Sequence, residues 1–346
     1  MSSISYNRKV RGFGLVEVMV AMVIGMLGIL VMMQVFSVAE QQKRTTTGAD
    51  DAETNGAIAI YGLQRDIRQS GYGITDMSLL GCSLQLRVGI TLNSIAAVAI
   101  NSNNIPAGDA NTDTLLILYG NTNGSPQGDG ITTQPAANVY AVQTPTAYLP
   151  ADNVIATPLS RSPTCSLILD QVQTIISPNV TVGAGVAGVS NGKLFNIGSA
   201  LHLIAYAVRG GNLTSCDYSV NDCGNVANVG NKAIWVSVAN NIVSLRVLYG
   251  RDTSGTMDGV VDVYDQTTPN SACNWSRVSA IQLALVARNG QFDKTNPTAV
   301  APVWVGSAVA PIDLTANADW HGYRYKLFQT TIPLRNIAWF GVQTGC

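Results

Sequence analysis

An apolar run of 27 residues constrains this chain more than any other feature. It covers residues 13–39, and Glu17 is its only charged residue. As a helix it would be about 40 Å long at ~1.5 Å per residue, which exceeds the roughly 30 Å hydrocarbon core of a bilayer. The run is also too long for the apolar core of a signal peptide. It therefore predicts a membrane-spanning helix.

The charges on either side of this run predict its orientation. Arg8, Lys9 and Arg11 precede it in a short polar segment, and most of the chain follows Lys43 and Arg44. Positive charges favour the cytoplasmic side of a membrane, so we expect a cytoplasmic N-terminus. The remaining residues would then lie in the periplasm or outside the cell.

Glu17 distinguishes the run from an ordinary anchor. A carboxylate in the apolar part of a spanning helix opposes insertion by roughly 2.5–3.5 kcal/mol, so it normally has a functional partner. Gly12 precedes the run, Phe13 opens it, and Glu17 follows four positions later. This arrangement resembles the cleavage and assembly motif of type IV prepilins and type II secretion pseudopilins. The alternative is a Glu17 side chain that reaches the edge of the membrane and has no special role.

The resemblance implies a specific processing chemistry. In that family, a membrane-embedded prepilin peptidase cuts after the glycine and methylates the new N-terminal residue, and the glutamate pairs with the N-terminal amine of a neighbouring subunit. Cleavage would fall here between Gly12 and Phe13, with Phe13 methylated and Glu17 as the assembly carboxylate. Gly14 replaces a common Thr, and Gln34 replaces a Pro that major pilins often carry. The second departure favours a minor subunit.

The helix is expected to continue beyond the membrane. Residues 40–69 contain no proline, and their apolar side chains recur with helical spacing. Gly71 provides a C-terminal stop. Ala21 and Gly25, four residues apart, form a small face where another helix could approach. We therefore expect a cleaved leader at 1–12, the transmembrane half of the helix at 13–39 and its amphipathic half at 40–70.

The rest of the chain predicts an α+β fold, with the long N-terminal helix packed on a strand-rich periplasmic domain at residues 71–346. All thirteen prolines lie beyond residue 105, where short β-rich runs alternate with Gly, Asn, Ser and Pro. The clearest predicted strands are residues 114–119, 165–170, 201–208, 233–238, 242–249, 278–286 and 326–334.

Four segments resemble PilW-type minor pilins. They are LQRDIRQSGY at 63–72, VSLRVLYGRD at 243–252, VSAIQLALVARN at 278–289 and YRYKLFQTTIPLRN at 323–336. The resemblance implies a minor pilin without catalytic activity, anchored in the inner membrane before assembly. Afterwards it would lie at the pilus tip with other minor pilins, the major pilin and a tip adhesin. The alternatives are a type II secretion minor pseudopilin and a membrane-anchored periplasmic enzyme or binding protein.

All six cysteines follow the apolar run, and their even number predicts disulfides in an oxidising compartment. Cys216 and Cys223 would close a short local loop; the alternative is two free buried thiols. The other pairs are guesses among fifteen connectivities. The two guessed pairs are Cys82 with Cys165 and Cys273 with Cys346.

A polar segment after residue 249 resembles a degraded calcium loop. Its ligand positions would be Ser254, Thr256, Asp258, Asp262 and Asp265. The alternative is a polar hairpin loop. No other cofactor is expected.

The sequence gives little support for dinucleotide binding, hydrolysis or histidine catalysis. A Gly-rich run at residues 183–192 matches both a dinucleotide-binding and a hydrolase pattern, but no helix pattern follows either match. Only His202 and His321 are available for histidine acid–base chemistry. Charged residues are 12% of the chain and the net charge is -1, so dedicated nucleic-acid binding is not expected.

Overall fold

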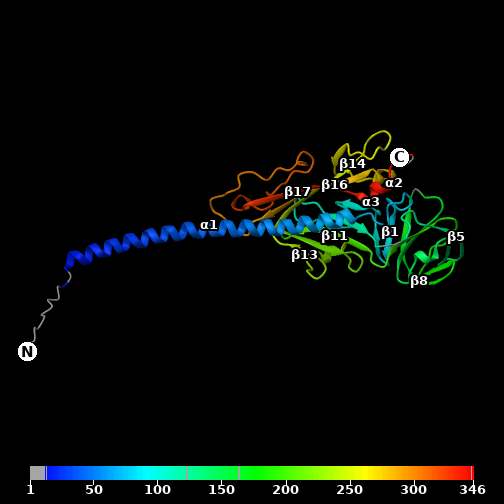
Figure 1. Cartoon of the computed structure of the whole chain (residues 1–346), viewed down its shortest axis with the longest axis horizontal. Coiled ribbons are helices and arrows are strands. Elements are labelled where there is room, and N and C mark those ends of the chain that lie inside the picture. The colour runs from blue at the N-terminus through cyan, green and yellow to red at the C-terminus, as the bar shows by residue number, and fades with distance from the viewer. Residues whose placement is uncertain (1–11, 13, 122–123, 163, 344) are drawn as a thin grey trace, which may run out of the picture. The chain divides into compact units, whose positions relative to one another are not determined.

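A single α-helix of 55 residues, α1 (Leu15–Gln69), opens the chain (Figure 1). The computed structural model describes residue 12 and residues 14–121, 124–162, 164–343 and 345–346. Two compact units divide the chain, residues 1–50 and residues 51–346, and α1 contributes to both. In the first unit, the stretch Leu15–Glu40 is long and apolar enough to cross a membrane, and all its side chains are exposed.

The helix ends where the sequence predicts. Gly71 has a φ of +82° and stands two residues after Gln69. This left-handed conformation suits glycine, which has no Cβ. The amide of Gly71 donates to the carbonyl of Leu118 at 2.8 Å, so the turn is fixed to a neighbouring strand.

Six strands close into an antiparallel barrel in the middle of the chain. Each strand pairs with the next in the order β8-β7-β10-β5-β6-β9, and β9 pairs again with β8. The strands are β5 (Asp129–Ala136), β6 (Val139–Val142), β7 (Asn153–Thr157), β8 (Ser166–Ile176), β9 (Asn179–Val182) and β10 (Lys193–Gly198). The barrel has its own apolar core, which includes Tyr140, Val154 and Leu194. Closure leaves the barrel without an open edge.

Side-chain alternation joins the barrel to the rest of the unit. Leu194 points into the barrel core, whereas its neighbour Phe195 belongs to the main core. Outside the barrel, β1 (Ser83–Arg87) pairs in parallel with β8 and antiparallel with β2 (Ile90–Leu92). The barrel is inserted between two adjacent strands, because Tyr119 and His202, which flank it, are cross-strand partners.

The remaining strands form two further sheets. A five-stranded sheet has the order β13-β12-β11-β4-β3, and a four-stranded sheet has the order β15-β14-β16-β17. The first contains β3 (Val98–Ile100), β4 (Leu115–Tyr119), β11 (His202–Arg209), β12 (Asn212–Asp217) and β13 (Val236–Ala239). The second contains β14 (Ile242–Arg251), β15 (Val263–Asp265), β16 (Val278–Arg288) and β17 (Tyr325–Pro333). Short helices are α2 (Ala272–Ser276), α3 (Arg335–Trp339) and the 3-10 turns η1 (Pro145–Ala147), η2 (Val226–Asn228) and η3 (Trp320–Gly322).

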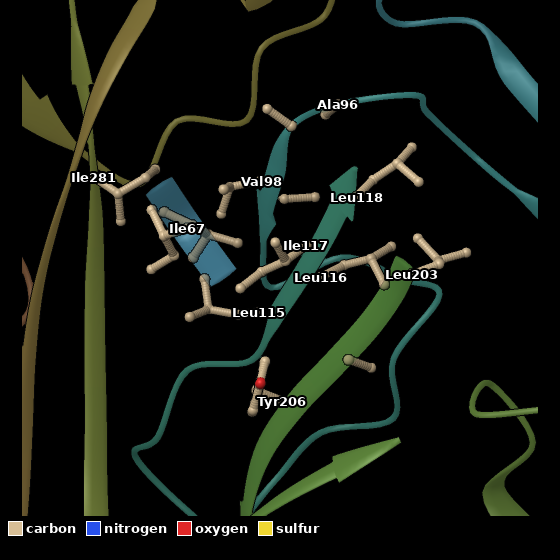
Figure 2. Close-up of a cluster of buried hydrophobic side chains, with 14 of the residues drawn as sticks. Ile67, Ala96, Val98, Leu115, Leu116, Ile117, Leu118, Leu203, Tyr206 and Ile281 are labelled. Atoms are coloured by element: carbon tan, nitrogen blue, oxygen red, sulfur yellow. The ribbon is translucent and has the colours of Figure 1, made fainter. Parts of the chain in front are cut away.

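The main core lies where the end of α1 meets these sheets. Figure 2 shows Ile67 of α1 among Val98, Leu115 and Ile117 of the five-stranded sheet and Ile281 of β16. The opposite face of the four-stranded sheet is covered by the long connection between β16 and β17, which contributes Trp304, Ile312 and Leu314. Most of β16 is therefore buried, as its apolar sequence requires. The α+β fold expected from the sequence is confirmed.

Candidate assembly site

The first turn of α1 places Glu17 against the backbone. The amide of Gly14 donates to Glu17 Oε2 at 3.3 Å, and the carbonyl of Gly14 accepts from the amides of Glu17 and Val18. Glu17 is thus the third helical residue and satisfies one free amide of the first turn, as in half of a capping box. Because residue 14 is glycine, it has no side chain to complete the other half. Gly12 is exposed, and Phe13 lies outside the described residues.

The apolar part of α1 leaves its small face uncovered. A methyl group added at Gly25 or Gly28 would meet no atom within 4 Å. Ala21 is also exposed, and the helix passes Gln34 without a break. Small residues on an exposed apolar helix allow close approach by a second helix. This surface therefore fits contact with lipid or with another helix.

Farther along, α1 buries a stripe of small and then larger side chains in the second unit. Ala52, Ala59, Leu63 and Ile67 are each at most 3% exposed. Gly56 continues this stripe, and a Cβ built there would lie 2.0 Å from the ring of Phe328 on β17. Glycine therefore allows β17 to approach the helix closely.

A buried carboxylate fixes the end of α1. Asp66 is 0% exposed; it accepts from Tyr206 Oη at 2.5 Å and from Arg65 Nε at 3.0 Å. Burial and the hydrogen bond to Asp66 raise the pKa of Tyr206, so its hydroxyl stays protonated and donates. Burial, followed by the nearby Asp66 charge, raises the pKa of Tyr119 to about 12. A buried charge is tolerated only with such partners, so Asp66 requires this orientation of the helix.

Residues from the C-terminal part of the chain secure the same helix end. Asn336 Nδ2 donates to the carbonyls of Gln69 and Ser70 at 3.0 and 2.9 Å. Gln64 Nε2 donates to Thr330 Oγ1 at 2.9 Å. The two bonds from Asn336 satisfy carbonyls that the end of a helix leaves free, and the bond from Gln64 ties the helix to β17.

The four segments that resemble PilW-type pilins thus form one structural unit. Residues 243–252 and 278–289 build β14 and β16, which pair with one another, and residues 323–336 build β17, which pairs with β16. Residues 63–72 are the helix end that these strands hold. Sequence reasoning did not identify Asp66, Gly56 or Asn336 as important. The signal for Asp66 was a charge between the apolar positions Leu63 and Ile67 on one helical face.

The structure pairs all six cysteines. The disulfides are Cys82–Cys165, Cys216–Cys223 and Cys273–Cys346. They are the three pairs named from the sequence. The first joins the start of β1 to the barrel, next to the pairing of β1 with β8.

The polar loop after β14 is organised around a carboxylate that was not among the predicted ligands. Asp252 is 2% exposed and accepts from the backbone amides of Ser254, Asp258 and Gly259 at 2.7–3.0 Å. Burial raises the pKa of Asp252, but these amides and the Arg277 guanidinium outweigh it, so the pKa is lowered. The loop is therefore held by an internal anion.

Two of the five predicted calcium ligands, Ser254 and Asp262, contact one another, and the others do not join them. Asp262 accepts from Ser254 Oγ at 3.2 Å, Asp258 accepts from the amide of Val260, and Asp265 forms an ion pair with Arg251 on β14. Thr256 is exposed. Within the part of the chain that the structure describes, no three His, Cys, Asp or Glu side chains form a group that could hold a metal. Calcium binding stays a prediction.

The Gly-rich run at residues 183–192 binds a carboxylate of the chain itself rather than a phosphate. The amides of Gly183, Ala184 and Gly185 donate to the carboxylate of Asp170 at 2.6–3.1 Å. Consecutive amides of this kind could bind a phosphate, but here the chain supplies its own anion. The run leads into strand β10, whereas a dinucleotide site or a hydrolase site requires a helix at this point.

Two family models match the chain. Residues 221–336 match the model described as type IV pilus-assembly protein W, and residues 7–33 match the prokaryotic N-terminal methylation motif. Among solved structures, a type IV-like pilin from Thermus thermophilus matches with a TM-score of 0.30 and 10% identity, over 84% of this chain and 96% of that chain. No curated protein matches. The likeness to type IV pilins therefore rests on the two family models, at residues 7–33 and 221–336.

Proposed function

Because the chain is a type IV pilin-like protein with an N-terminal methylation motif and a type IV pilus-assembly protein W region, we propose that it is a minor pilin. It would help to start assembly of a type IV pilus and would lie at the tip of the fibre with other minor pilins. The observation that supports this most is one helix that is exposed and apolar over Leu15–Glu40 and anchored in a strand domain at its other end.

Glu17 would link subunit association to the membrane. Before assembly its carboxylate bonds only one backbone amide, at 3.3 Å, among the described residues. Cleavage between Gly12 and Phe13 would create an ammonium group one helical turn away in every subunit. An ammonium and a carboxylate that neutralise one another in lipid remove the penalty that each bears alone. Burial of Glu17 would therefore favour contact with a neighbouring N-terminus.

The proposed role needs no catalysis. Prepilin peptidase would process the chain, the inner membrane would hold it before assembly, and the strand domain would lie in the periplasm. Major pilin, sibling minor pilins and a tip adhesin would then contact it at the cell surface. The buried Asp66 contact supports this role, since it keeps the strand domain in a fixed orientation on the end of α1.

The first test is the N-terminal sequence of the protein purified from piliated cells. We expect a chain that begins at methylated Phe13. An intact Met1, or cleavage beyond Ala39, would contradict the proposal.

The second test separates the pilus from a secretion system. Deletion of the protein should remove surface pili and leave secretion intact; the reverse result would indicate a type II secretion pseudopilin. Complementation with Glu17→Gln should fail to restore pili although the protein is processed and folded. Glu53→Gln is the matched control, because Glu53 lies on the same helix and its ion pair with Lys326 is exposed.

A further inference from the structure

Two arginines lie on either side of the tight turn between β11 and β12. Arg209 begins this turn, and its guanidinium carbon lies 4.3 Å from the ring centroid of Trp235. Arg288, at the end of β16, stacks in the same way on Tyr323 at 4.5 Å. Both arginines are partly buried. Such stacking holds a guanidinium in place and leaves its edge free for hydrogen bonds.

Each arginine lines a hollow, and the two hollows adjoin. Their volumes are about 540 Å³ beside Arg209 and about 420 Å³ beside Arg288. Asp109 and Gly210 line both hollows, so they form a divided groove across the turn. These volumes lie in the range of sites for small molecules, roughly 300–1,000 Å³. Lys232 is exposed at the wall of the larger hollow.

Neither arginine is fully paired within the protein. The Arg209 guanidinium donates to the carbonyls of Pro106 and Ala107, whereas the Arg288 guanidinium forms no hydrogen bond or ion pair with a described residue; it is the backbone amide of Arg288 that donates, to the carbonyl of Asn241. The Nε atoms of both, and Nε1 of Trp235, are buried without a partner among the described residues. A guanidinium carries five N–H donors, and that of Arg209 bonds two carbonyls among the described residues. An anionic group that reaches the terminal nitrogens of either arginine would therefore meet donors that are still free.

The acceptors in the groove restrict the ligand further. Asp109 accepts from the amides of Gly210 and Gly211, and Asp313 accepts from Asn111 and Thr315. Carboxylate oxygens can accept more than one hydrogen bond, so both remain available to hydroxyl groups. They would repel a chain of closely spaced phosphates. The groove thus fits a ligand with hydroxyl donors and an occasional carboxylate.

We infer that this groove binds an acidic carbohydrate, with uronate carboxylates at Arg209 and Arg288 and sugar hydroxyls at Asp109 and Asp313. The amide side chains of Asn231 and Asn240 and the mixture of charges suit a hydroxyl-rich ring. This inference does not depend on pilus assembly, and its failure would leave the proposed function intact.

The test uses the full-length protein in detergent micelles and isothermal titration with trigalacturonate. Arg209→Gln and Arg288→Gln should each weaken binding about tenfold or more, because each removes a charge-assisted hydrogen bond. Lys232→Ala should also weaken binding, and because Lys232 is exposed this variant separates a loss of binding from a loss of folding. Arg335→Gln is the matched control, since Arg335 is exposed and lines neither hollow.

Three comparison ligands distinguish the alternatives. A neutral trisaccharide, triglutamate and a short single-stranded oligonucleotide should each bind at least about tenfold more weakly than trigalacturonate. Equal binding of triglutamate would indicate an acidic-peptide site, and equal binding of the oligonucleotide would indicate a phosphate site; either result overturns the inference. So would the absence of trigalacturonate binding, or binding that all three groove variants leave unchanged.

Discussion

Replacing Gly56 by alanine tests how α1 docks on the strand domain. Alanine favours a helix over glycine by about 1 kcal/mol, so the change should be stabilising in open space. At Gly56 the new methyl group would lie 2.0, 2.6 and 2.6 Å from three ring atoms of Phe328. Carbon atoms in contact are normally ~3.5–4.0 Å apart, so the ring or the helix must move. Overpacking of this kind destabilises by about 1–3 kcal/mol.

Gly62 provides a matched control on the same helix. A methyl group there would meet no atom within 4 Å, so Gly62→Ala should stabilise by about 1 kcal/mol. Since both substitutions gain the same helix propensity, their difference isolates the overpacking at Phe328. We expect Gly56→Ala to be about 1–3 kcal/mol less stable than Gly62→Ala. At about 2–4 °C per kcal/mol, thermal unfolding should separate them by several degrees.

The assay is thermal unfolding of the full-length protein in detergent micelles, followed by near-ultraviolet circular dichroism. A second comparison repeats Gly56→Ala in a Phe328→Ala background, where the methyl group no longer meets a ring. The penalty at Gly56 should then disappear. Equal stabilisation by Gly56→Ala and Gly62→Ala in the natural background would show that β17 does not approach α1 at this point.

Three further predictions concern the strand domain. Disulfide stabilisation grows with loop length, so Cys82→Ser, which opens a separation of 83 residues, should destabilise by about 4 kcal/mol. Cys216→Ser, with a separation of 7, should destabilise by about 2–3 kcal/mol, and a larger loss for Cys216→Ser than for Cys82→Ser in chemical denaturation would contradict the reasoning. Because folding raises the pKa of Tyr119 from 10.0 to about 12, its contribution to stability should be complete below pH 10 and lost as the pH rises through about 12; unfolding measurements at stepped alkaline pH would refute this if stability stayed constant. Asp252→Ala should destabilise by about 3 kcal/mol because it removes the anion at the centre of its loop; chemical denaturation that gives the variant the stability of the natural protein would contradict this. Isothermal titration with millimolar calcium tests the predicted calcium loop, and the absence of binding heat would refute that prediction.

The membrane-proximal part of the fold could be predicted because its signals are local. A long apolar run and a proline-free continuation predict a helix, and Gly71 predicts its end without reference to any other segment. The strands at residues 242–251 and 278–288 were also visible, because buried strands are continuous apolar runs.

The barrel could not be predicted from the sequence. Four of its six strands have only 4–6 residues, and closure depends on the second pairing of β8 with β9 and on pairings between strands far apart in the chain. The role of Asp66 was equally hidden, because its partner Tyr206 is 140 residues away. Nothing in the sequence around Gly56 indicates a contact with another segment. Its role as a contact with Phe328 requires the position of β17.

The barrel is inserted between two residues that are cross-strand partners, so the five-stranded sheet could accept a different insertion at this place. Tyr119 and His202 face one another across β4 and β11, so the chain leaves the five-stranded sheet and returns to it at neighbouring points. A short hairpin could bridge these points, and strands of another protein could replace those between them, once Cys82 is given a new partner or removed and new contacts replace the pairing of β1 with β8 and the packing of Phe195 in the main core. Related pilins could therefore gain, lose or trade this cassette over evolution while keeping the helix anchor, and an engineer could display a foreign domain at the same place.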